Sequence, residues 1–151
     1  MRPTNHLGYL LQHVASLLAK QSDQVLQEQL GIGLAQFKIL QLLKVCPDVK
    51  QRDVANDLGQ TEASISRQVK LMLDDGLLHS IINPKDHRQH LTVPTRKGLR
   101  LAEAAMAVLE KYHAPTFTAL GTKQHEQLDE LLGVLHGRVC HTAHPDPTAH
   151  A

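Results

Sequence analysis

The chain has 151 residues, a length that suits one domain with terminal extensions. Aromatic residues make up only 3% of it while hydrophobic residues reach 42%, so the core must be aliphatic, which favours packed helices over an all-β sandwich. Sixteen Lys and Arg against fifteen Asp and Glu leave a net charge of +1, so a nucleic-acid surface would require a local concentration of charge. Two cysteines are too few for a disulfide framework, and no apolar run is long enough to span a membrane, so we expect a cytoplasmic protein.

Helical periodicity dominates the first part of the chain. Apolar residues at i, i+3 and i+4 spacing predict a long helix over residues 6–30, which Gly31 and Gly33 terminate. A second helix begins near Leu34 and stops before Pro47, because proline cannot continue it. Gly33 stands at the N-cap of this second helix, where it offers no capping side chain.

Two shorter helices follow. One is expected at about residues 50–58, with Gly59 as its left-handed C-terminal residue. Thr61 can cap the next helix, which Gly76 ends and whose inner stripe consists of Ile65, Val69 and Met72. Two short helices joined by a tight glycine-containing turn form a helix-turn-helix.

The pattern then changes to that of strands. Residues 77–82 and 87–93 are expected to form a β-hairpin around the turn Asn83-Pro84-Lys85-Asp86. Pro94 should end the pairing, since it has no N–H to donate. Five basic residues and one acidic residue lie between positions 79 and 100, so the hairpin region supplies the positive charge that the net total conceals.

Two further helices complete the prediction. Thr95 can cap a long fifth helix, in which Pro115 should produce a kink or a break. Gly121 ends that helix, Thr122 caps a sixth, and residues 141–151 should form a frayed tail. The predicted fold is therefore mainly α with a small β-hairpin wing, a winged helix-turn-helix joined to long helices.

The outer face of the fourth helix indicates DNA binding. Opposite Ile65 the side chains are small or basic, so the backbone can approach the floor of a major groove. Arginine can donate two hydrogen bonds to guanine or to a phosphate, and a capped helix N-terminus suits phosphate contacts. Together with the hairpin tip, the predicted DNA-binding residues are Thr61, Ala63, Ser64, Ser66, Arg67, Lys70, Lys85, Asp86 and Arg88.

Several short motifs, taken in order and spacing, resemble the MarR family of bacterial transcriptional regulators. DHRQHLTVPTRKG is similar to the family's D-x-R wing and the L-T-x-x-G start of the next helix, and LAQFKIL, VANDLG, SISRQV and DDGLL also match. The resemblance implies that Ser64, Ser66 and Arg67 read the major groove and that Arg88 reaches the minor groove. It implies that Asp86 orients Arg88 or ties the wing to the domain. Pro94 departs from the usual Leu, which leaves open an early end of the second wing strand.

The same resemblance implies an organisation and a function. The chain divides into an N-terminal dimerisation helix (1–30), a winged helix-turn-helix DNA-binding region (34–98), C-terminal dimerisation helices (99–140) and a flexible tail (141–151). It would be a homodimeric, ligand-responsive repressor that needs no cofactor and binds a pseudo-palindromic operator in double-stranded DNA. A small phenolic or anionic inducer would lie between the dimer helices and the winged helix. Candidate ligand residues are Tyr9, His13 and Phe37, for which ordinary packing or surface roles are the simpler explanation.

Alternative functions remain open at this point. A winged-helix module for protein contact would fit the near-neutral charge. A metal-responsive regulator would use His136, Cys140, His141 and His144, whose spacing suits zinc, although the sequence predicts no specific metal site. A thiol-responsive regulator would use Cys46 or Cys140, for which two inert thiols are the simpler explanation. No enzyme is expected, since no zincin, nucleophile-elbow, P-loop or dinucleotide motif is present.

Histidines are frequent, with eleven in the chain, and three of them lie in the wing. Protonation of His79, His87 and His90 below about pH 6.5 would add positive charge beside DNA. This predicts stronger operator binding at acidic pH.

Overall fold

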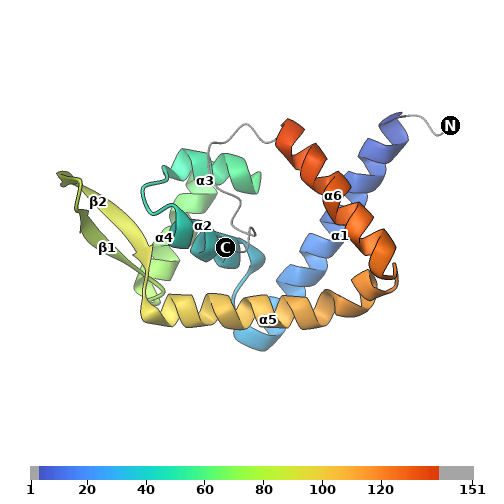
Figure 1. Ribbon diagram of the computed structural model, residues 1–151. Helices are drawn as coiled ribbons and strands as arrows, with labels where there is room; N and C mark the ends of the chain where they lie inside the picture. Colours follow the sequence, from blue (N-terminus) through green and yellow to red (C-terminus); the bar gives the residue numbers. More distant parts are fainter. Residues whose placement is uncertain (1–3, 140–151) are drawn as a thin grey trace.

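The computed structural model describes residues 4–139 as a set of helices with one antiparallel hairpin that projects from one side (Figure 1). The mainly α fold with a two-stranded wing is confirmed. In chain order the elements are α1 (Thr4–Leu30), α2 (Leu34–Val45), α3 (Gln51–Leu58), α4 (Glu62–Asp74), β1 (Leu78–Asn83), β2 (Asp86–Pro94), α5 (Arg96–Thr118) and α6 (Thr122–Val139).

The winged helix is built on an aliphatic core between α2, α3, α4 and the hairpin. The inner stripe predicted for α4 is confirmed, because Ile65, Val69 and Met72 are all buried. Burying this stripe leaves the opposite face of α4 open. The core cluster consists of Ile39, Leu40, Leu42, Leu43, Val54, Ala55, Ile65, Val69, Met72, Leu77, Leu78 and Ala102.

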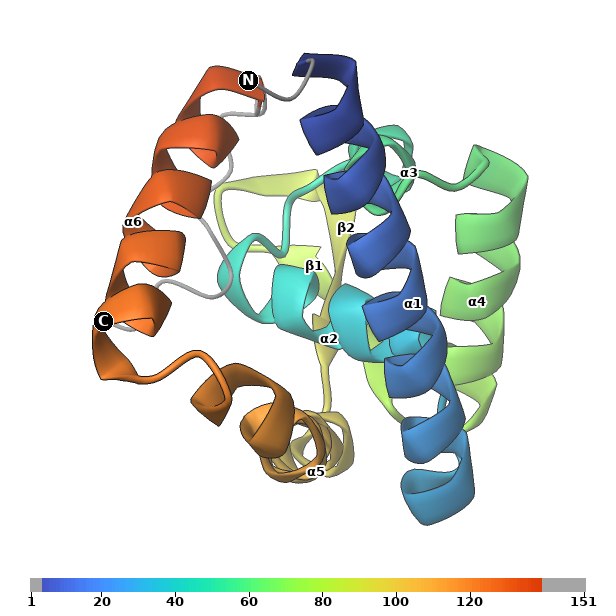
Figure 2. The same ribbon diagram turned by 90° about the vertical axis from the view of Figure 1, so that its right-hand side faces the viewer.

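A second, smaller cluster joins α1 and α5 to the winged helix. Leu26 of α1, Phe37 of α2 and Ala105 of α5 pack together with Ile32. Figure 1 shows α5 running below the winged helix, and Figure 2 shows α6 on the left, rising from the end of α5, and α1 on the right, running down past the level of α5. The two clusters hold the winged helix against α1 and α5, while α6 buries none of its side chains.

The connection between α1 and α2 contains a cap that the sequence did not suggest. Gly33 offers no side chain, but Asp23 of α1 reaches the start of α2, where its Oδ1 accepts a hydrogen bond from the Leu34 N–H at 2.8 Å. A β-carbon at Gly33 would lie 3.1 Å from the same oxygen. The glycine therefore leaves room for a cap that comes from another helix.

The local predictions around prolines and caps have mixed outcomes. The pairing of β2 with β1 ends at Pro94, as predicted, and it does not end earlier, because Pro94 itself lies opposite Leu78. Helix α5 does not break at Pro115, since one helix runs from Arg96 to Thr118, although its last turns bend away from the axis of the rest (Figure 2). The carbonyl that this proline leaves without a helical donor belongs to the exposed Lys111, so water can take the place of the missing N–H. Thr122 is the first residue of α6 rather than its cap.

None of the helices within residues 4–139 combines the length and the apolar character needed to cross a bilayer. The predicted tail, residues 141–151, lies outside the described residues.

Candidate nucleic-acid interface

The N-terminus of α4 is held by the threonine predicted to cap it. Thr61 has an extended backbone, and its Oγ1 accepts a hydrogen bond from the Ser64 N–H at 3.1 Å. The Ser64 hydroxyl in turn donates to Oε1 of Gln60 at 3.1 Å. The sequence did not indicate a role for Gln60, whose side chain accepts the hydrogen bond of Ser64, one of the hydroxyls predicted to read DNA. Helix α4 therefore begins at a fixed residue, which sets the rotation of its outer face.

The outer face of α4 is open to solvent, as predicted. Ala63, Ser66, Arg67 and Lys70 are exposed, and Ser64 is half-buried at the flank. Within residues 4–139 one ion pair forms, between Arg52 and Asp53 on α3. The cationic groups of α4 thus have no acidic partner in the described part of the protomer, which favours an external polyanion.

The hairpin tip is organised by two side chains that accept from the backbone. Oδ1 of Asn83 accepts from the Lys85 N–H at 2.9 Å, and Oδ1 of Asp86 accepts from the Arg88 N–H at 3.1 Å. Both basic side chains are exposed. Asp86 thus fixes the backbone that carries Arg88, and among the described residues it forms no ion pair with the guanidinium. Asn83, buried at 9% exposure, could have been identified from its Asn-Pro turn signal.

The junction between α4 and α5 ties the recognition helix to the long helix behind it. Thr95 Oγ1 donates to the Gly76 carbonyl at 2.6 Å and accepts from the Gly98 N–H at 3.1 Å. Lys97 Nζ donates to the Asp75 carbonyl at 2.8 Å. A lysine at this negative helix end is electrostatically favourable. Lys97 therefore stabilises the C-terminus of α4, although the charge pattern of the sequence places it among the basic residues of the wing region.

The three candidate ligand residues lie in two different environments. Tyr9 and His13 are exposed on the first half of α1, where their rings stack with centroids 5.8 Å apart. Phe37 is buried beside Leu26, which follows His13 by thirteen positions, roughly 20 Å along a helix. One protomer therefore does not gather the three side chains around one small molecule.

The candidates for thiol and metal chemistry are only partly within the described residues. Cys46 is buried, and burial together with the nearby Asp48 and Asp57 carboxylates raises the pKa of its thiol. This disfavours the reactive thiolate. His136 is exposed on α6, whereas Cys140, His141 and His144 lie outside the described residues. Within residues 4–139, no group of three or more His, Cys, Asp or Glu side chains is arranged to hold a metal ion.

Comparison with known proteins finds similarity to one family of regulators. Residues 32–90, which contain the helix-turn-helix and most of the wing, match the model of the MarR family. A curated relative, the HTH-type transcriptional regulator BilQ of Clostridium symbiosum, is 27% identical over 110 residues, which cover 73% of this chain and 75% of BilQ. The winged-helix region of the chain is therefore similar to that of MarR-family transcriptional regulators, and the chain has a winged-helix fold.

Solved structures of MarR regulators share this fold beyond the winged helix. The Mycobacterium tuberculosis MarR family protein Rv2887, in complex with p-aminosalicylic acid, aligns with a TM-score of 0.76 at 23% identity, covering 89% of this chain and 98% of that protein. CouR from Rhodococcus jostii RHA1, bound to p-coumaroyl-CoA, aligns with a TM-score of 0.71 at 24% identity, covering 90% and 93%. These alignments extend the family's fold to α1, α5 and α6.

Proposed function

We propose that this protein is a MarR-family transcriptional regulator, a homodimeric, ligand-responsive repressor that binds a pseudo-palindromic operator. The observation that carries the proposal is the outer face of α4, a capped helix with exposed Ser66, Arg67 and Lys70 and no acidic partner among the described residues. The adjoining wing presents Lys85 and Arg88 on a backbone fixed by Asp86. Helix α4 would enter a major groove while the wing contacts the neighbouring backbone and minor groove.

The second copy in this proposal would cover apolar surface that one protomer leaves exposed. On α1 the exposed residues are Leu7, Tyr9, Leu10, Leu11, Val14 and Leu17, and on α6 they are Leu131, Leu132, Val134, Leu135 and Val139. Monomeric proteins rarely expose apolar rows of this length on two helices. Pairing these helices with a second protomer would place two copies of α4 about 34–36 Å apart, the spacing of successive major grooves.

The inducer in this proposal is a small aromatic acid or a related phenolic compound. Rv2887 in complex with salicylic acid and CouR bound to p-coumaroyl-CoA share this fold, which supports an aromatic ligand. Tyr9 and His13 form an exposed stacked pair, and a second protomer would be needed to enclose them. The dimer would have conformations that differ in the distance between its two winged helices. An inducer lowers operator affinity by binding more tightly to a conformation in which this distance does not match the operator.

Selection of binding sites from random double-stranded DNA tests the proposal directly. We expect an inverted repeat whose half-sites are one helical turn apart, and an affinity that falls steeply with salt as phosphates are neutralised. A protein-contact module would select no sequence. Size-exclusion chromatography with light scattering should give twice the mass of the chain, and a monomer would contradict the proposed dimer.

Two variants then test how DNA is read. Arg67→Ala should abolish the preference for the selected sequence while the dimer stays folded. Arg88→Ala should weaken binding broadly, by roughly 1–3 kcal/mol. Lys44→Ala is the matched control, because Lys44 is an exposed basic residue on α2, outside α4 and the wing. Unchanged binding by both arginine variants would defeat the proposed docking.

A further inference from the structure

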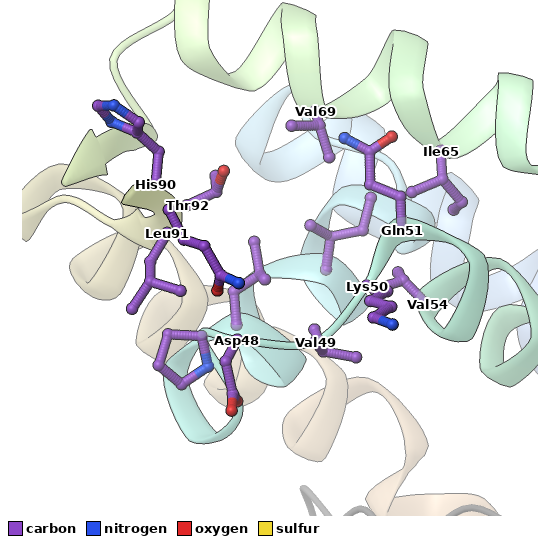
Figure 3. A pocket seen from close by; sticks show the side chains of 14 residues that line it. Asp48, Val49, Lys50, Gln51, Val54, Ile65, Val69, His90, Leu91 and Thr92 are labelled. Carbon is purple, nitrogen blue, oxygen red and sulfur yellow. The ribbon is translucent and has the colours of Figure 1, made fainter. Parts of the chain in front are cut away.

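A cleft inside the winged helix has no role in the DNA-binding surface described above. It lies between β2, the α2–α3 connection and the inner side of α4 (Figure 3), and its volume is about 440 Å³. Clefts that hold small molecules typically measure about 300–1,000 Å³. It lies within one protomer, and Tyr9, His13 and Phe37 are absent from its lining, so it differs from the proposed inducer site.

The lining of the cleft combines an apolar floor with uncharged polar groups. Ile65 and Val69 extend from α4 towards the cleft, and the Gln51 amide reaches towards Val69 from the start of α3 (Figure 3). Thr92 adds a hydroxyl from β2. Within residues 4–139 neither the Gln51 amide nor the Thr92 hydroxyl forms a side-chain hydrogen bond. Both groups can therefore form hydrogen bonds with a ligand.

The backbone of β2 adds further hydrogen-bonding groups. In the described chain the sheet has the order β1-β2, so β2 pairs on one edge only. Residues Gln89, Leu91 and Thr92 line the cleft from this strand. An unpaired strand edge presents N–H and C=O groups that a bound molecule can satisfy.

The charges around the cleft disfavour an ionic ligand. Asp48 and Lys50 carry opposite formal charges and lie on the side away from Val69 (Figure 3). The His90 ring is turned away from the cleft, and its Nδ1 lies 3.4 Å from the Ser80 hydroxyl. An ion in the apolar interior would lose hydration without gaining a net opposite charge. The lining instead suits a flat, uncharged ring that bears one or two hydrogen-bonding groups.

We infer that this intradomain cleft is a second ligand site, which binds small uncharged ring compounds such as phenols and aromatic amides. Such a ligand would touch Ile65 and Val69 on the inner side of α4, whose neighbours Ser66 and Lys70 face outward. It would also touch Gln89, which follows Arg88 in the wing. A ligand in the cleft would therefore affect both α4 and the wing, the two elements proposed to contact DNA. This effect on DNA binding rests on the proposed function, whereas binding of the ligand to the cleft does not.

Methyl NMR on the full chain tests the site, with 4-hydroxybenzamide as the uncharged probe. We expect saturable shifts at the Val54, Ile65 and Val69 methyl groups, with a Kd on the order of 1 mM for so small a molecule. The anion 4-hydroxybenzoate, with the same ring, should bind this site at least tenfold more weakly. Shifts centred on Leu26 and Ile32, or equal binding of the two probes in the cleft, would overturn the inference.

Cavity-filling variants localise the binding. Thr92→Phe should lower the affinity at least tenfold, while Thr92→Ser, which keeps the space, should change it less than threefold. If Thr92→Phe does not fold, Gln51→Trp provides the same test from an exposed position at the start of α3. Unchanged affinity in the folded filling variant would overturn the site. Binding of the selected DNA is measured on the same samples, so DNA binding without probe binding refutes the cleft alone.

Discussion

Gly98→Ala is the sharpest test of how α5 meets the recognition helix. Alanine normally stabilises a helix interior by about 0.5–1 kcal/mol relative to glycine. Here a methyl group on Gly98 would overlap the carbonyl oxygen of Leu77 and lie 3.1 Å from Cδ2 of Leu40. The Leu77 carbonyl also accepts the Thr95 N–H at 3.0 Å, so the helix cannot move away without stretching that bond.

The expected magnitude follows from these opposing effects. Overpacking costs typically about 1–3 kcal/mol, and loss of the Thr95–Leu77 hydrogen bond costs about 0.5–1.5 kcal/mol. After subtracting the gain in helix propensity, we expect a net destabilisation of about 2 kcal/mol. In urea, with a slope of about 2 kcal/mol per molar, this lowers the unfolding midpoint by about 1 M.

Urea unfolding followed by circular dichroism measures this effect. All variants are compared at one protomer concentration, because dimerisation would make the midpoint depend on concentration. Glu103→Ala is the matched control, since Glu103 is an exposed residue on the same helix, outside the contact with Leu77. The control should be neutral or slightly stabilising. A Gly98→Ala protein as stable as the parent would refute the close approach of α5 to Leu77.

Further predictions concern Asp23, Thr95 and Cys46. Asp23→Ala should lower the free energy of unfolding by about 1 kcal/mol because α2 loses its cap. Asp23→Asn should retain most of the stability, and equal losses by the two variants in urea unfolding would contradict the cap. Thr95→Val should cost about 1–2 kcal/mol through loss of the bonds to Gly76 and Gly98, and Thr95→Ser should restore them; a stable valine variant would argue against this junction. In a Cys140→Ser background, Cys46 should react with a disulfide reagent at pH 7.5 more slowly than free cysteine, and fast labelling would count against its burial. Because folding raises this thiol pKa above 9.0, its contribution to stability is complete below about pH 9 and falls as pH rises further, which pH-dependent unfolding would detect.

Much of α4 was predictable because each of its signals is local in sequence. The stripe of Ile65, Val69 and Met72 follows helical periodicity, and Thr61 caps the helix through a bond to a residue three positions on. The exposed position of Arg67 follows from the same rotation. A local cap and a local stripe are sufficient to decide which face of a helix is open.

Contacts between distant segments could not be predicted in this way. Asp23 caps α2 from eleven positions away, and only the angle between α1 and α2 brings its carboxylate to Leu34. The charge pattern assigned Lys97 to the wing region, but packing of α5 against the end of α4 directs its ammonium to a carbonyl. The predicted alternative of a break at Pro115 was wrong, because a solvent-exposed helix end tolerates one missing N–H.

These distant contacts determine how a signal from the proposed dimer helices would reach DNA. Asp23 fixes the start of α2 to α1, while Thr95 and Lys97 fix the end of α4 to α5. Ala102 of α5 belongs to the same buried cluster as Ile65 of α4, so the winged helix cannot rotate freely on α5. A change in the angle between α1 and α5 would therefore move the winged helix as one body and alter the distance between two recognition helices. Binding in the intradomain cleft would act differently, because it touches α4 and β2 within one head and changes their relative position without any movement of the dimer helices.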